Sequence, residues 1–401
     1  GGATALYNKK LLNTNLRWEQ SQTFEVGLDI GFLQNRLSFI LDFYSRRTKD
    51  LLTKQALPGY TGFSDIVTNM GTLRNSGLEA EVKANIINKG GFTWDMTANI
   101  TSVANKIIAL PYNNVENNRV GGYEVAAGKV DANGKFPTKW IAGRQEGGKL
   151  GELVGYRQQH VFKDWDDVKQ HANLRVDEVA NLYGPGLADQ INPATGKTYK
   201  ESSGWQPIEP GDACWEDING DNIINGYDRS VMGNIFPNVT GGFSTTFGYK
   251  GLSLYARFDY ALGHTLYNDL KARSLGQYQG QFNIITDVKD MWSEANPNSD
   301  LTKFYYADQL AKKNITRSNN ASTAADNNSS RYYEKGDYLA LREVTLSYQL
   351  PKSLISKVHM TDASVYVTGQ NLFYITGYGG VSPEPAVSTT YGRGIDNGRY
   401  P

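Results

Sequence analysis

The chain has 401 residues, 39% of them apolar, and its 41 basic side chains balance 41 acidic ones, so the formal net charge is zero. No run of about 18 apolar residues is present, which excludes a transmembrane helix, and no basic run supports nucleic-acid binding. The single cysteine, Cys214, excludes an internal disulfide, and we expect it to be incidental. Four histidines favour neither a histidine-based metal site nor a catalytic triad. We therefore expect that the protein is not an enzyme.

Alternating residues mark the first pair of predicted strands. In residues 23–31, Phe24, Val26, Leu28 and Ile30 share one parity, while the other carries polar residues and glycine; residues 36–46 repeat the pattern. Successive side chains of a strand point to opposite faces, so each strand is apolar on one face and mostly polar on the other. Three more pairs follow, at 77–87 with 92–101, 242–249 with 252–261, and 338–350 with 363–373. Arg342 breaks the apolar parity near its strand start, where we expect an interface position.

The connections alternate between short turns within the pairs and long segments between them, at 48–76, 102–241 and 262–337. Ten tilted residues rise some 23–25 Å, about the height of an outer-membrane apolar band. Compact domains rarely carry such loops, whereas outer-membrane barrels carry them on the extracellular side. We therefore predict an all-β fold, an antiparallel transmembrane β-barrel segment with long extracellular loops. Within the longest loop we expect local strands near residues 154–156 and a short helix from residue 164.

The expected organisation follows from these connections. It consists of a lead-in at 1–22, two barrel hairpins at 23–101, a long extracellular loop at 102–241, a third hairpin at 242–261, a second extracellular loop at 262–337, a fourth hairpin at 338–373, and a loop at 374–401 before a missing last strand. The start has no charged or apolar leader pattern, and the end does not resemble a barrel closure. We therefore expect one piece of a longer chain.

A twelve-residue segment at 217–228, DINGDNIINGYD, carries the one sharp chemical motif. Side-chain oxygens fall at its positions 1, 3, 5, 9 and 12, and position 7 offers a backbone carbonyl, which is the spacing of an EF-hand calcium loop. The predicted ligands are Asp217, Asn219, Asp221, Ile223, Asn225 and Asp228.

Two positions of this loop depart from the EF-hand pattern. Asn222 replaces the glycine of position 6, although asparagine tolerates positive φ better than most residues. Asp228 replaces the glutamate of position 12, as in the dockerin-type variant that this loop resembles. We predict bound Ca²⁺, or Mg²⁺, that braces the long loop and takes no part in catalysis; a polar turn without an ion is the alternative interpretation.

Loop aromatics are weaker candidates, because each ring could stack on a sugar or peptide substrate but could equally pack within a loop. They are Trp140, Trp165, Trp205, Trp215, Tyr278 and Trp292. Carboxylates on the polar strand parity, such as Glu79 and Glu81, could form a glycosidase pair. We favour the interpretation that they are solvated side chains facing the barrel lumen.

Several segments, in order, resemble the C-terminal part of SusC-like TonB-dependent outer-membrane transporters of Bacteroidetes. They are NLRWE at 15–19 with VGLD at 26–29, DFY at 42–44 with TKDLL at 48–52, GFS at 62–64 with NMG at 69–71 and NSGLE at 75–79, PGD at 210–212 with the calcium-type loop, DR at 228–229 and GN at 233–234, and GQNL at 369–372. Each segment is weak alone, but their order and spacing make the set specific, and they cover nearly the whole chain.

The resemblance implies a plugged barrel of about 22 strands, of which this chain supplies about eight. It implies import of oligosaccharides or peptides, powered through TonB at a missing N-terminal part and assisted by a SusD-like surface lipoprotein. The expected partners are the plug and remaining strands of the same transporter, the lipoprotein, TonB, a glycan or peptide substrate, and membrane lipid or lipopolysaccharide, at the bacterial outer membrane. The alternatives are a passive porin or adhesin and a secreted calcium-dependent carbohydrate-active protein.

Overall fold

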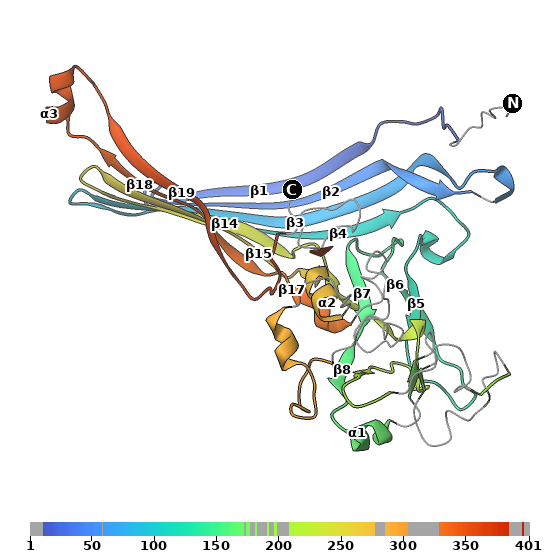
Figure 1. The fold of residues 1–401 in the computed structure, drawn as a ribbon. Coiled ribbons are helices and arrows are strands. Elements are labelled where there is room, and N and C mark those ends of the chain that lie inside the picture. Colours follow the sequence, from blue (N-terminus) through green and yellow to red (C-terminus); the bar gives the residue numbers. More distant parts are fainter. Residues whose placement is uncertain are drawn as a thin grey trace, which may run out of the picture.

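The computed structural model describes residues 11–57, 59–171, 174–176, 181–182, 191, 196–198, 208–276, 285–303, 329–384 and 395–396. Its main feature is one curved sheet of eight strands, each antiparallel to its neighbours, in the order β1-β2-β3-β4-β14-β15-β18-β19 (Figure 1). These strands are β1 (Gln20–Phe32), β2 (Leu37–Ala56), β3 (Asp65–Lys89), β4 (Phe92–Ala109), β14 (Val239–Tyr249), β15 (Leu252–Leu262), β18 (Tyr338–Gln349) and β19 (Ser364–Thr376). The antiparallel barrel wall that the alternation predicts is therefore confirmed.

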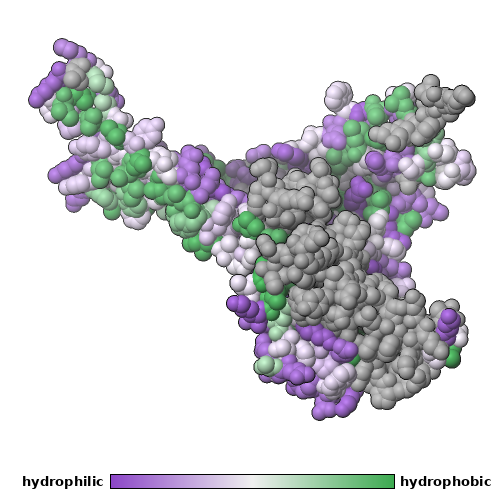
Figure 2. All heavy atoms as spheres, in the orientation of Figure 1, coloured by the Kyte–Doolittle hydropathy of each residue, from purple (hydrophilic) through white to green (hydrophobic). Residues whose placement is uncertain are grey.

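The apolar parity of the strands forms continuous rows across the ladder. Leu28 pairs with Leu41 on the next strand, and at the other side of the sheet Leu254, Leu346 and Val367 are successive partners. These side chains are exposed, from 40% for Leu254 to 67% for Val367. Hydrophobic residues gather on the arm at the left of Figure 2, which is the region of β18 and β19 in Figure 1. A face of this kind is stable against lipid, not water.

The connection expected at 48–76 is wrong in its extent, because most of it is strand. β2 continues to Ala56 and β3 begins at Asp65, so only residues 57–64 join them. The alternation fails after Thr48 because the register shifts on both sides of Leu51, next to Asp50 at a φ of 56°. Such bulges hide a continuing strand from a period-2 pattern. The other two long connections lie at the end of the sheet opposite α3 (Lys352–Ile355), as Figure 1 shows.

Those two connections carry several small sheets. Their strands are β5 (Tyr123–Ala126), β6 (Thr138–Ile141), β7 (Glu152–Tyr156), β8 (Gln158–Val161), β9 (Arg175–Val176), β10 (Asn181–Leu182), β11 (Ala213–Trp215), β12 (Ile223–Ile224), β13 (Arg229–Asn234), β16 (Thr265–Asn268) and β17 (Tyr333–Lys335), with β20 (Ile395–Asp396) beside β16. Their α-helices are α1 (Trp165–Gln170) and α2 (Asp269–Gly276). The local strand near 154–156 and the helix after residue 164 are thus confirmed, with Asp164 as the N-cap of α1.

Short 3-10 helices complete the described secondary structure. They are η1 (Gly59–Thr61), η2 (Glu116–Asn118), η5 (Gly226–Asp228), η6 (Thr286–Asp290), η9 (Ser330–Tyr332) and η10 (Ser356–Val358). Over the described ranges, none of the helices has the length and apolar content that a membrane crossing needs.

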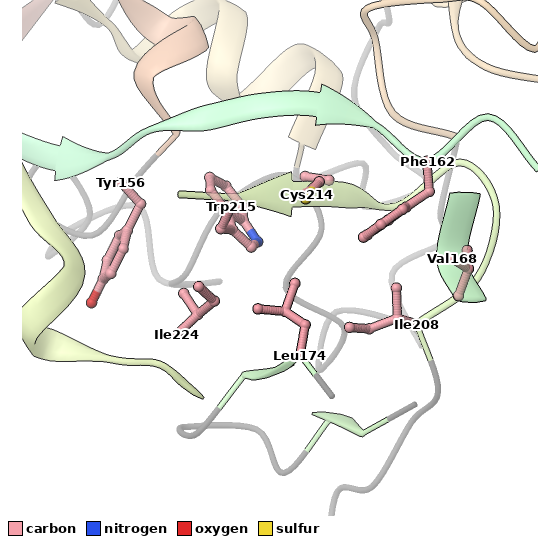
Figure 3. Packing of buried hydrophobic residues seen from close by; sticks show 9 residues of the cluster. Tyr156, Phe162, Val168, Leu174, Ile208, Cys214, Trp215 and Ile224 are labelled. Atoms are coloured by element: carbon pink, nitrogen blue, oxygen red, sulfur yellow. The ribbon is translucent and has the colours of Figure 1, made fainter. Parts of the chain in front are cut away.

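The buried cores lie in these connections, not within the curved sheet. One cluster, shown in Figure 3, brings Trp215 and Cys214 of β11 against Tyr156, Phe162 and Ile224. A second cluster packs α2 against Tyr267 and Tyr332. Because each core is closed by its own side chains, the loop region is a small folded unit that can hold side chains in fixed positions above the barrel wall.

Candidate functional site

The calcium-type loop is anchored to the first core at its centre, and its last residue is also buried. Ile224 is fully buried in the cluster of Figure 3, and Asp228, the last predicted ligand, is also fully buried. Asn225 caps η5 by accepting from the N–H of Tyr227, and the Asp228 side chain accepts in return from the N–H of Asn225. This reciprocal capping fixes the second half of the loop.

Backbone amides orient the first two carboxylates of the loop. Asp217 accepts from the N–H groups of Gly220 and Asn222, at 2.7 and 2.8 Å. Asp221 accepts from the N–H of Ile223 at 2.8 Å and from the amide of Asn219 at 2.9 Å. Each carboxylate oxygen keeps a further lone pair for a cation. Asn222 sits at a φ of 63°, so it adopts the left-handed conformation that position 6 requires.

The loop gathers three carboxylates that form no ion pair among the described residues. Burial raises the pKa of Asp228 to about 6; hydrogen bonds from Asn225 and Ile218 oppose the rise, and the charges of Asp217 and Asp221 add to it. The nearby Lys129 ammonium donates to the backbone carbonyl of Asp217. A divalent cation would relieve this repulsion, and the oxygen donor set suits Ca²⁺ or Mg²⁺.

The four aromatic candidates within the described residues lie in different surroundings. Trp215 is 2% exposed and lies edge-on to Tyr156, so it is a core side chain that offers no face to a substrate. The Arg119 guanidinium covers the ring of Trp140, and the indole of Trp292 donates to the carbonyl of Lys163. Trp165 is 48% exposed at the start of α1. The remaining two, Trp205 and Tyr278, lie outside the described residues.

The structure brings together one cluster that the sequence spacing did not reveal. His160, His171 and Cys214 offer ligand atoms that all lie within 4.8 Å of one another, and among the described residues they are the one such group of histidine, cysteine or acidic side chains. The oxygens of Asp217, Asp221 and Asp228 do not converge this closely. Burial raises the pKa of Cys214 to about 12, and the Asp167 charge adds to the rise, so the metal-free thiol is no nucleophile.

Known proteins resemble this chain along almost its whole length. The family model described as TonB dependent receptor-like, beta-barrel matches residues 1–205. The chain is 27% identical over 395 residues to TonB-dependent receptor P3 of Formosa agariphila, covering 97% of this chain and 33% of that protein. It is 26% identical over 398 residues to TonB-dependent receptor SusC of Bacteroides thetaiotaomicron, covering 98% and 32%. The chain thus spans about a third of the length of these curated relatives.

Solved structures show the same fold. The RagAB peptide transporter superposes with a TM-score of 0.61 at 22% identity, over 97% of this chain and 35% of that one. The "open-open" state of the RagAB peptide importer gives a TM-score of 0.63 at 20% identity, over 98% and 34%. At these sequence identities the structural similarity shows the fold alone. It indicates that the curved sheet of this chain is part of a barrel wall.

Proposed function

Because the chain belongs to the TonB-dependent receptor-like β-barrel family and is an outer-membrane protein, we propose that it forms the C-terminal barrel part of a SusC-like importer for oligosaccharides or peptides. One observation carries the proposal. An eight-stranded wall exposes continuous apolar rows, and a folded loop region stands at one end of it. The name of the RagAB peptide importer supports the peptide half of the substrate class.

The missing part of the barrel is the first partner in this proposal. Within the described residues, β1 and β19 are the edge strands of the sheet. A bilayer does not tolerate open edges, because their unpaired N–H and C=O groups would be buried in hydrocarbon. The remaining strands and plug of the same transporter close the barrel, and lipid or lipopolysaccharide covers its apolar rows.

The polar face and the loops give this part its role in import. The polar strand parity lines the lumen, and the loop region lies at the extracellular mouth, where a SusD-like lipoprotein closes over the substrate. Trp140, Trp165 and Trp292 stay our predicted stacking residues, as do Trp205 and Tyr278, which lie outside the described residues. TonB acts on a part of the protein outside this chain, so these residues guide and enclose the substrate without powering transport, catalysing a reaction or binding nucleic acid.

We propose that the 217–228 loop binds Ca²⁺, with Mg²⁺ as the alternative ion. Carboxylates of Asp217, Asp221 and Asp228, amide oxygens of Asn219 and Asn225, and the carbonyl of Ile223 would hold it. The fit rests on the donor chemistry and on the uncompensated charge at buried Asp228. The ion would brace the loop region at the mouth of the barrel.

Uptake by the full-length transporter tests the import proposal. Deletion of the gene in its native host should abolish uptake of one labelled oligosaccharide or peptide pool, and the intact gene should restore it. Removal of TonB in the same host should abolish uptake to the same extent. Uptake that persists without TonB would instead assign a passive porin, and a protein that stays in solution without detergent would overturn the barrel assignment.

A further inference from the structure

A cluster of metal-ligating side chains lies in the loop region, outside the calcium-type loop. Half of the four histidines of the chain and its one cysteine converge there. They come from three elements, because His160 lies on β8, Cys214 on β11 and His171 at the C-terminal end of α1. Three side chains of metal-ligating types are therefore brought together from separate elements of the fold.

The fold sets the positions of the first two side chains. β8 and β11 are antiparallel, and His160 is the direct partner of Cys214 in their register. Side chains of direct partners project from the same face of a ladder. Cys214 is 1% exposed, and its sulfur lies in the cluster of Figure 3 beside Phe162. The thiol is therefore held in place by packing, while His160 is 39% exposed and reaches solvent.

Helix α1 supplies the third side chain. Asp164 caps the helix by accepting a hydrogen bond from the N–H of Asp167. This cap starts α1 shortly after the end of β8. At the other end, Nδ1 of His171 lies 3.0 Å from the carbonyl oxygen of Asp167. A backbone carbonyl at one ring nitrogen is the usual device that fixes the tautomer of a metal-bound histidine and leaves the other nitrogen to bind.

Asp167 brings a carboxylate to the same point. Nε2 of His160 lies 3.3 Å from both of its oxygens, and Nδ1 of His171 lies 3.8 Å from Oδ1. The N–H of Lys163 donates to Oδ2 at 3.1 Å and fixes the carboxylate, which is 12% exposed. Tetrahedral Zn²⁺ with nitrogen, oxygen and sulfur ligands has ligand–ligand separations of about 3.4–3.6 Å. Within the group of His160, His171 and Cys214, the ligand atoms are up to 4.8 Å apart, and side-chain rotations that move these atoms by about one ångström bring them to that range.

We propose that His160, His171, Cys214 and Asp167 bind a divalent transition metal of the Zn²⁺ class. The donor set, two imidazoles, one thiolate and one carboxylate, is that of a closed tetrahedral site, in contrast to the all-oxygen set of the 217–228 loop. The metal reaches the site through a cleft of about 370 Å³ lined by His160, Asp167 and Asp300 among others. Its role is to tie β8 and α1 to β11.

Metal analysis of the full-length transporter, purified from outer membranes in detergent, tests the proposal. After chelation and reloading with Zn²⁺, the wild type should hold one Zn²⁺ per chain that Cys214→Ser and His160→Gln both lose. Asp167→Asn should weaken binding, because the carboxylate ligand is lost. His359→Gln is the matched control, because His359 lies beyond α3 on the short-turn side and outside the cluster.

The absorption spectrum after Co²⁺ loading distinguishes the loss of a ligand from general structural damage. The wild type should show a near-ultraviolet thiolate-to-Co²⁺ charge-transfer band, which Cys214→Ser should lose and His359→Gln should keep. An Asp217→Ala/Asp221→Ala variant should also keep it, which separates the two sites. Folding is followed by the heat-dependent gel shift of the barrel. A folded wild type without the band, or equal Zn²⁺ content in wild type and Cys214→Ser, would overturn the proposal whether or not the variants fold.

Discussion

The Nε of Arg342 lies 3.0 Å from Oδ2 of Asp259 across the β15–β18 ladder. A bulge makes this contact possible, because Leu341 pairs with Phe258 and Glu343 with Arg257, so Arg342 is the extra residue between them. The guanidinium also donates to the hydroxyl of Tyr374 and to Glu384. We expected the parity break at Arg342 to mark an interface position. The structure shows that it marks a β-bulge, which turns the arginine toward polar partners.

Replacement of Arg342 by leucine should destabilise the barrel by about 1–3 kcal/mol, because Asp259 and Glu384 would lose their shared donor. The arginine is 15% exposed, but Asp259 is 42% exposed, so solvent screening keeps the effect below that of a fully buried pair. Arg257→Leu is the matched control, since Arg257 is exposed and lies two residues from Asp259 along the same strand face. Urea unfolding in detergent measures both variants, and equal midpoints would contradict the role of the network.

Acid should release the segment that carries Glu384. Burial alone raises the pKa of Glu384, but hydrogen bonds from Arg342, Tyr338 and Tyr374 outweigh it and leave the pKa below its ordinary value of 4.5. A depressed carboxyl pKa stabilises the fold above the unfolded value and loses that contribution as the pH falls through the folded value. The stability difference between wild type and Glu384→Gln should thus be constant above pH 4.5 and shrink below it. A difference that grows in acid would refute the assignment.

The wall of the barrel is predictable from the sequence because lipid and lumen impose opposite polarity on successive residues. Strands such as β14 and β15 lie within a few residues of their predicted ranges, since no bulge interrupts the pairing between them. The extensions of β2 and β3 escaped prediction, because bulges around Leu51 break the period while the hydrogen-bonded ladder continues. The alternation of polar and apolar residues therefore predicts the membrane-facing part of a strand better than it predicts where the strand ends.

A charge on the lipid face should be costly where the same charge on the lumen face is not. Leu346 is 42% exposed in an apolar row between Leu254 and Val367, whereas Ser347 projects from the opposite face. Leu346→Arg should cost up to about 2–4 kcal/mol, depending on its depth in the bilayer. Ser347→Arg, one residue away, should be nearly neutral. The comparison is made by refolding yield into lipid vesicles, and equal yields would place both faces in water.

The two candidate metal sites differ in how far the sequence reveals them. The donors of the 217–228 loop are every second residue from Asp217 to Asn225, followed by Asp228, so their spacing alone predicts the motif. His160 and Cys214 are brought together by strand pairing, and His171 by the helix between them, so no local spacing marks this group. The count of four histidines predicts no histidine-based metal site, and a count does not report which residues the fold makes neighbours.

Calcium should stabilise the loop region through Asp217 and Asp221, and chelation should reverse the effect. At a free Ca²⁺ concentration of 100 times Kd, one site contributes about 2.7 kcal/mol. Binding is measured calorimetrically well above pH 6, because Asp228, with a pKa of about 6, must be ionised. Asp217→Ala/Asp221→Ala should lose binding and protection of the loop from protease. Asp131→Ala is the matched control, since Asp131 also accepts from two backbone N–H groups in an exposed turn outside the loop. If the folded wild type binds no Ca²⁺, or if both variants bind it equally, the loop is a polar turn held by its own amides.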